Sequence, residues 1–338
     1  TLSKDRLGKR IRKFKRDRHG KALDELENCS DLVTKLKSLE NKNEINILSH
    51  NGEALSPEES VNALMDKHCP GSVPVKTESL PKIIKSKENI NEETKYITTA
   101  YVKRAIKEFG RHKTAGPDGM KPIILQNLPR STLEAITMLM KASVAMSYTP
   151  KGWRHANMIF IPKAGKATYD SVSSYRPITL NSFLFKALER VMLWWLIRDH
   201  FESRKMSKHQ FAYRKGMSCE TAISRVVDRI ESALYRKQQA VGVFLDISGA
   251  FDNVDHDKAI QAMRNRNMPE QFVSWYGHCL KNRTVTAEIA GAVCSRSIAR
   301  GTAQGGVLSP VIWNIIIEPL LIKMNEVCLL YTSDAADE

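Results

Sequence analysis

The sequence of 338 residues contains no run of apolar residues long enough to span a bilayer. Its first ten residues, TLSKDRLGKR, have neither the apolar core of a signal peptide nor an initiator methionine. No internal repeat is visible, which excludes a solenoid. With 42% hydrophobic and 26% charged residues, the chain has the composition of a globular protein. We therefore expect no membrane partner, and we expect a fragment of a longer protein.

Cysteine is scarce, and its spacing gives no metal site. The six cysteines stand at positions 29, 69, 219, 279, 294 and 328. No two of them have the spacing of metal ligands, and no histidine lies at zinc-finger distance from a cysteine pair. We expect free thiols in a reducing compartment.

Acidic residues are outnumbered, and the formal net charge is +15. The first 21 residues contribute strongly, with ten Lys and Arg against two Asp. Leu7, Ile11 and Phe14 recur at helical spacing, so this stretch is predicted to be an amphipathic helix whose solvated face is basic. Such a face attracts the phosphate backbone of nucleic acids. The candidate nucleic-acid-binding residues are Lys9, Arg10, Arg12, Lys13, Lys15 and Arg16.

The pattern of elements predicts an α+β fold, because few strands are separated by helices of mixed length. Strands are expected at ANMIFIPK (156–163), QAVGVFLDIS (239–248, buried on both faces) and RTVTAEIAG (283–291, exposed). Helices are expected in the ranges that follow: 56–68 with Ser56 as N-cap, 99–109, 131–147, 181–201 with Asn181 as cap, 219–236, 258–264, 270–280 and 309–327.

Asp246 is the first candidate for chemistry. It ends the apolar run VFLD, where a buried carboxylate is costly unless a cation or a proton satisfies it. An Asp there can hold a divalent metal for phosphoryl transfer. Taken alone, the stretch favours an Asp that caps the following turn.

Cations and a glycine-rich loop elsewhere strengthen the metal interpretation. Lys163 follows a predicted strand, Arg176 precedes a Pro-stiffened turn, and Gln304, Gly305 and Gly306 precede a predicted helix. Paired glycines let a backbone approach a flat ligand such as a base pair. Singly, each cation is an ordinary surface charge. Together with Asp246 they predict a triphosphate site.

The ordered motifs IPK, YRPI, QFAYRKGMS, FLDISGAFDNV and GTAQGGVLSPVIWN resemble the reverse transcriptase domain of non-LTR (LINE-type) retrotransposons. The upstream segments HKTAGPDGM and GEALSPEESVNALMDKHCP are also similar to those that precede that domain. The resemblance covers roughly residues 51–327. It implies a right-hand polymerase with fingers and a partial palm, whose antiparallel sheet is backed by helices, and with no thumb in this sequence.

The resemblance also implies roles for individual residues. Asp246 corresponds to a catalytic carboxylate that binds metal, with the carbonyl of Ile247 beside it, and the complete enzyme would use two Mg²⁺ ions. Phe251 corresponds to the bulky residue under the sugar, which selects deoxynucleotides. Lys163, Arg176, Gln304, Gly305 and Gly306 correspond to nucleotide-binding residues. The implied partners are an RNA template, a DNA primer and a dNTP, at nuclear DNA after assembly in the cytoplasm.

This chain departs from the family pattern at Ala212, Tyr213 and Ala303, which leaves the sub-family open. Two other functions also stay open. One is a catalytically dead or domesticated module that binds RNA without copying it. The other is a group II intron or similar reverse transcriptase, although residues 51–70 and the wording ISGAFDN favour the LINE type.

The last residues depart further from the family. The expected adjacent aspartates are missing, because two alanines separate Asp334 from Asp337. CLLYTSDAADE (328–338) back-translates to the adaptor of a transposase-based sequencing library, so this tail is expected to be non-native. The predicted domains are a basic helical region (1–95), fingers and the start of the palm (96–235), an incomplete palm (236–327) and the tail. The chain ending in this tail is expected to lack polymerase activity.

Overall fold

The computed structural model describes residues 45, 47, 53–75, 90–201 and 206–326. The chain divides into two compact units, Thr1–Ala54 and Leu55–Glu338. The second unit is described below. Among the described residues, no helix has both the length and the apolar character needed to cross a membrane.

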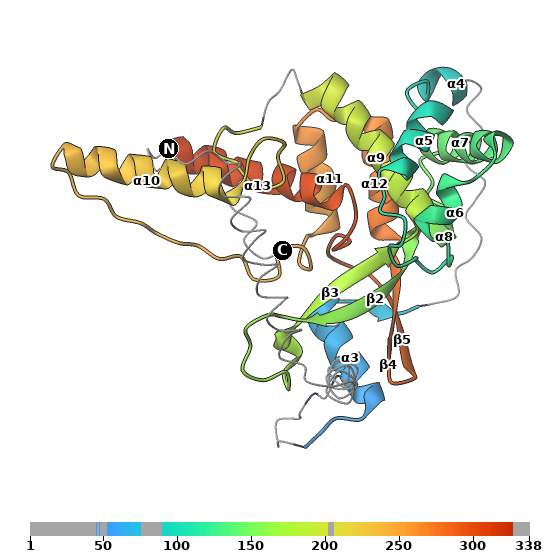
Figure 1. Cartoon of the computed structure of the whole chain (residues 1–338), viewed down its shortest axis with the longest axis horizontal. Helices are drawn as coiled ribbons and strands as arrows, with labels where there is room; N and C mark the ends of the chain where they lie inside the picture. Colours follow the sequence, from blue (N-terminus) through green and yellow to red (C-terminus); the bar gives the residue numbers. More distant parts are fainter. Residues whose placement is uncertain (1–44, 46, 48–52, 76–89, 202–205, 327–338) are drawn as a thin grey trace, which may run out of the picture. The chain divides into compact units, whose positions relative to one another are not determined.

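The strands of the unit form a five-stranded sheet, which lies between α3 and the larger group of helices (Figure 1). The strands are β1 (Val73–Pro74), β2 (His155–Pro162), β3 (Tyr175–Asn181), β4 (Thr284–Ile289) and β5 (Ala292–Ser297). Their order is β1-β5-β4-β2-β3. Three neighbouring pairs run antiparallel, whereas β2 and β4 are parallel, with Ala156 opposite Val285. The α+β class is confirmed, but the sheet is mixed instead of purely antiparallel.

Helices account for most of the remaining described chain. Their bounds are α3 (Pro57–His68), α4 (Ile90–Glu93), α5 (Thr99–Lys107), α6 (Pro122–Gln126), α7 (Arg130–Ala145), α8 (Lys151–Arg154), η2 (Val172–Ser174), α9 (Phe183–Leu196), η3 (Ile197–Phe201), α10 (Cys219–Tyr235), α11 (His256–Asn265), α12 (Glu270–Lys281) and α13 (Ser309–Glu326).

Helix α3 covers one face of the sheet. It begins with the expected N-cap, Ser56, which forms a capping box: Ser56 Oγ accepts from the Glu59 N–H and Glu59 Oε2 accepts from the Ser56 N–H. Val61, Leu64 and Met65 are fully buried on its inner side, and the helix packs on β4 and β5. Strand β4 was predicted to be exposed, which is wrong, because β2, β5 and α3 surround it.

The largest core lies among α5, α7, α9, α11, α12 and α13, grouped beyond the end of the sheet at which β2 begins (Figure 1). Trp275 of α12 is fully buried in it, and its Nε1–H donates to Ser143 Oγ of α7 at 3.1 Å. The N-cap of α9 is Ser182, whose Oγ accepts from the Leu184 N–H. The prediction of Asn181 as the cap is wrong by one residue, because Asn181 ends β3.

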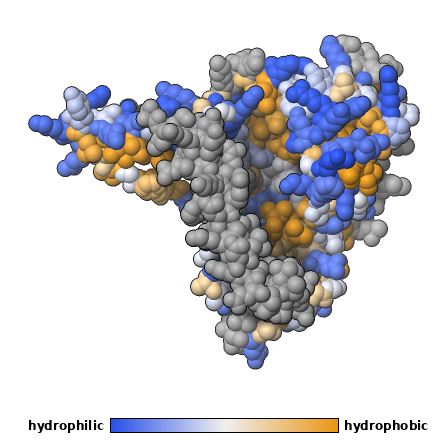
Figure 2. All heavy atoms as spheres, viewed as in Figure 1, coloured by the Kyte–Doolittle hydropathy of each residue, from blue (hydrophilic) through white to orange (hydrophobic). Residues whose placement is uncertain are grey.

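Helix α10 keeps an apolar stripe in solvent. Ile223, Val227, Ile230 and Leu234 recur on one face and are 41–61% exposed. Figure 2 shows apolar side chains along this helix. Ala222 is its one residue described as buried. After α10 the chain continues into a segment without assigned secondary structure, which leads to Asp246.

Candidate active site

The β2–β3 hairpin places the two candidate cations at the same end. Arg176 of β3 stands opposite Ile161 of β2, near the end of the ladder. Lys163 follows β2, and its backbone N–H donates to the Ser174 carbonyl at 2.8 Å. The sequence prediction that these two residues lie together is therefore supported by their placement. Both side chains are partly exposed, so they remain accessible to an anion.

The glycine-rich loop lies against the same hairpin. The backbone N–H of Thr179 in β3 donates to the Gln304 carbonyl at 2.7 Å. Gly305 has a φ of +114°, and a Cβ there would lie 2.8 Å from the Thr179 carbonyl oxygen. Only glycine fits so close an approach in that backbone conformation. The structure thus brings Gln304, Gly305 and Gly306 to the strand that carries Arg176.

The turn that carries Phe251 joins the start of this loop. The Phe251 carbonyl accepts from the Thr302 N–H at 2.9 Å, and the Val254 carbonyl accepts from the Gly301 N–H at 2.7 Å. Gly301 has a φ of +88°, and a Cβ there would lie 2.8 Å from the Asp252 carbonyl oxygen. Phe251 is therefore fixed to the segment that leads into Gln304.

The Phe251 ring packs near two other aromatic rings. Its centroid is 6.0 Å from that of Tyr213 in an edge contact and 5.9 Å from that of Trp313 in α13. These separations suit favourable ring pairs. Tyr213 is one of the positions at which the sequence departs from the resemblance, and here it contacts the residue expected to select the sugar.

Within the described part of the chain, Asp246 has no hydrogen bond to β3, to the Gln304 loop or to the turn that carries Phe251, and it lies on an exposed segment. Residues 239–248 were predicted to form a strand buried on both faces, and that prediction is wrong: the segment has no assigned strand structure, and Phe244 is 95% exposed. Asp246 is exposed, and Ile247 is 47% exposed. A strand needs a paired edge and a covering layer, and the outer edge of β3 already bonds to the Gln304 carbonyl.

The residues in place do not by themselves form a metal centre. Across the described ranges, no group of three or more His, Cys, Asp or Glu side chains is arranged to hold an ion. Asp252, the acid nearest to Asp246 in the turn, has its Oδ2 3.3 Å from Nδ1 of His68 in α3. The Asp246 carboxylate and the Ile247 carbonyl are oxygen donors of the kind that Mg²⁺ takes, but they are too few to enclose it.

Two buried residues near this site were missed by the sequence analysis. Glu189 of α9 is 1% exposed, and its carboxylate accepts from the Val307 N–H at 3.0 Å and from the Leu308 N–H at 3.5 Å. Burial raises the pKa of Glu189 to about 7. His68 is 8% exposed. Their positions in the sequence carried a signal, because each falls at helical spacing among apolar residues.

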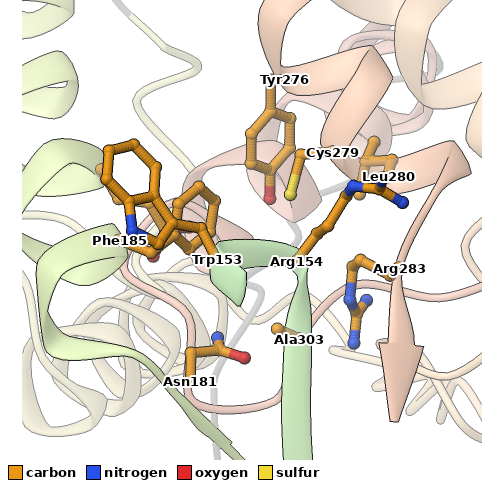
Figure 3. Close-up of a pocket in the computed structure, with 10 residues that line it drawn as sticks. Trp153, Arg154, Asn181, Phe185, Tyr276, Cys279, Leu280, Arg283 and Ala303 are labelled. Carbon is orange, nitrogen blue, oxygen red and sulfur yellow. The ribbon is translucent and has the colours of Figure 1, made fainter. Parts of the chain in front are cut away.

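A small cavity lies beside Glu189. Figure 3 shows side chains of Arg154, Asn181, Tyr276 and Arg283 around it. Its space for the centre of a water molecule is about 10 Å³, which suits a single water. The cavity is therefore too small for a nucleotide.

The family described as "Reverse transcriptase (RNA-dependent DNA polymerase)" matches residues 161–336 of this sequence. The chain belongs to the reverse transcriptase family. The matched range contains Lys163, Arg176, Phe251 and the Gln304 loop. It also includes residues 328–336 of the tail that we expect to be adaptor-derived. That tail lies outside the described residues, and its origin stays a prediction.

Known relatives confirm the resemblance to retrotransposon enzymes. The chain is 32% identical over 220 residues to "RNA-directed DNA polymerase from mobile element jockey" of Drosophila melanogaster, covering 65% of this chain and 24% of the relative. It is 28% identical over 261 residues to "Probable RNA-directed DNA polymerase from transposon BS" of the same species (72% and 29%). It is 25% identical over 267 residues to "Retrovirus-related Pol polyprotein from type-1 retrotransposable element R1" of Bradysia coprophila (79% and 26%).

This reverse transcriptase chain spans about a quarter of the length of these relatives. The similarity therefore concerns one part of each relative and not the whole polymerase. The six basic residues proposed for nucleic-acid binding, from Lys9 to Arg16, lie outside the described residues.

Proposed function

We propose that this chain is the fingers and part of the palm of an RNA-directed DNA polymerase encoded by a non-LTR retrotransposon. The whole protein would add deoxynucleotides to a DNA primer on an RNA template. The observation that carries the proposal is the joining of three motifs: the loop of Gln304 is bonded to β3, which carries Arg176, and to the turn that carries Phe251. Segments far apart in sequence are thus joined by backbone hydrogen bonds.

Each of these residues has a chemical role in the proposal. Lys163 and Arg176 offset the negative charge of the incoming triphosphate. The Gln304–Gly306 backbone lies along the new base pair. The Phe251 ring lies under the sugar, where it would clash with a 2′-hydroxyl group. Six basic residues, Lys9, Arg10, Arg12, Lys13, Lys15 and Arg16, contact the nucleic-acid backbone.

Asp246 completes the proposal as a metal ligand together with the Ile247 carbonyl. Reverse transcriptases generally use divalent metal ions, which stabilise the attacking and leaving oxygens of nucleotidyl transfer. Further carboxylates are required beyond those described. We infer that residues 239–248 take up strand pairing when these carboxylates are present, because this pairing would cover the exposed Val243, Phe244 and Leu245.

The test uses the longer natural protein that contains this sequence. With Mg²⁺ and dNTPs, it should extend a DNA primer on an RNA template. Asp246→Ala should abolish extension and leave template binding within about two-fold, because one carboxylate is removed from an exposed position. Asp257→Ala is the matched control, since Asp257 is an exposed acid on α11 that pairs with Lys281.

Two results would count against this function. Full primer extension by Asp246→Ala would contradict the assignment of Asp246 as a metal ligand. RNA binding without any extension by the unsubstituted longer protein would favour the alternative of a module that binds RNA and does not copy it.

A further inference from the structure

Glu189 is a buried carboxylate that the proposed chemistry does not use. It lies in the middle of α9, whose buried neighbours Phe185, Leu188 and Met192 are apolar. A buried carboxylate is costly unless it is hydrogen-bonded or paired with a cation. Its position therefore needs a structural reason.

Its hydrogen bonds go to the chain directly after the nucleotide-binding loop. Glu189 Oε2 accepts from the Val307 N–H at 3.0 Å, and Oε1 accepts from the Leu308 N–H at 3.5 Å. These two residues stand between Gly306 and the first residue of α13, Ser309. The carboxylate thus satisfies N–H groups at the start of an 18-residue helix, where a negative charge is also favourable.

The other end of the loop is attached to a different element. The Thr179 N–H of β3 donates to the Gln304 carbonyl at 2.7 Å. Between the two attachments, Gly306 donates its N–H to the Ala303 carbonyl at 2.9 Å. The loop is therefore held between β3 on one side and α9 on the other, and Glu189 supplies the α9 attachment.

We propose that Glu189 is a positioning residue. It holds the Gln304–Gly306 loop against β3, in the position required for nucleotide binding. This inference rests on the proposed polymerase function. It assigns to α9, which does not itself contact the nucleotide, control over the loop that does.

The groups around Glu189 determine how this attachment responds to pH. They are Lys186 and Arg190 on α9, Tyr276 and Cys279 on α12, Arg283 after α12, and Arg154 of α8 across the small cavity. Burial is the largest influence and raises the pKa of Glu189 to about 7, against the lowering effects of the two N–H bonds, Lys186 and Arg283. Because the folded environment favours the protonated carboxyl, opening the attachment and exposing Glu189 to water costs more free energy as the pH falls through 7.

Amide hydrogen exchange on this chain tests the attachment without requiring polymerase activity. Glu189→Gln keeps the shape but replaces one of the two acceptor oxygens with an NH2 group, which cannot accept from an N–H group. We expect exchange protection of the amides of residues 304–308 to fall at least ten-fold, while the amides of α7 and α12 keep theirs. Glu134→Gln, which removes an exposed carboxylate paired with Arg130 on α7, is the matched control and should change none of these amides.

A second measurement covers the case in which Glu189→Gln fails to fold. In the unsubstituted chain, protection of the Val307 and Leu308 amides, corrected for the intrinsic exchange rate, should rise between pH 8 and pH 6. A flat profile, or loss of protection spread evenly over the core in Glu189→Gln, would overturn the proposal. In the longer protein, Glu189→Gln should raise the KM for dNTP about ten-fold with a smaller change in kcat. If the unsubstituted longer protein does not extend primers, the polymerase function fails while the exchange result stands.

Discussion

Adding a methyl group to Gly305 should destabilise the protein more than adding one to a glycine in open space. At Gly305 the φ is +114°, and the new Cβ would lie 2.8 Å from the Thr179 carbonyl oxygen, which is backbone and cannot rotate away. At Gly165 the φ is +79°, and no atom lies within 4 Å of a new Cβ. Gly305→Ala and Gly165→Ala therefore share backbone strain and differ in crowding.

The expected magnitudes follow from these two geometries. Backbone strain at a positive φ costs on the order of 1–3 kcal/mol at either site. At Gly305 the loop must also move from β3, which lengthens the 2.7 Å bond between the Thr179 N–H and the Gln304 carbonyl. Leaving a buried N–H without its acceptor costs about 1–3 kcal/mol. The free energy of unfolding should therefore fall by about 2 kcal/mol more in Gly305→Ala than in Gly165→Ala.

Urea denaturation of the two variants and the unsubstituted chain, followed by tryptophan fluorescence, measures this difference directly. Gly216→Ala, also at a positive φ of +81° with no atom near a new Cβ, provides a second open-space control. If the free energies of unfolding of Gly305→Ala and Gly165→Ala agree within about 0.5 kcal/mol, the loop does not pack on β3 as described. The proposal of a shared nucleotide-binding surface would then be refuted.

Other perturbations give separate expectations. The folded-state pKa of Glu189, about 7, lies above the usual 4.5, so its stabilising contribution is complete below pH 4.5 and is lost as the pH rises through 7. Between pH 5 and 8, urea titrations should show the unsubstituted chain losing about 3 kcal/mol relative to Glu189→Gln, and parallel pH profiles would contradict this. Arg266→Met should cost roughly 3–5 kcal/mol, because the Glu318 carboxylate, 15% exposed, loses its cation; Arg264→Met, whose partner is exposed, should cost under about 1 kcal/mol by the same titration. In the longer protein, Phe251→Val should raise ribonucleotide incorporation at least ten-fold in primer extension, whereas unchanged selectivity would make the ring a packing residue only.

The parts of the fold that the sequence predicted well are local. Ser56 caps the helix that directly follows it in the chain, so this cap signal is complete in a few residues. The strand at residues 155–162 was likewise visible as an apolar run of β-branched residues. Tertiary partners were not predictable in this way. The parallel pairing of β2 with β4 joins segments about 130 residues apart, and no local pattern in either segment identifies its partner.

The candidate site divides in the same manner. Lys163, Arg176 and the Gln304 loop could be proposed from motifs, and their backbones do meet. The strand predicted for Asp246 failed, because an apolar pattern specifies what a segment would bury and not which edge it pairs with. Glu189 escaped notice because it was read as one polar residue in a long apolar helix. Its meaning depends on Val307 and Leu308, which are more than 100 positions away.

The packing of α3 on β4 and β5 has a practical consequence for producing this chain. The family match begins at residue 161, inside β2, yet Asn62 of α3 accepts from the Arg296 side chain of β5, and β1 pairs with β5. A clone that began at the edge of the family match would lack α3, β1 and six of the eight residues of β2. Gene boundaries drawn upstream of Ser56 keep α3, β1 and the whole of β2 with the elements they pack on.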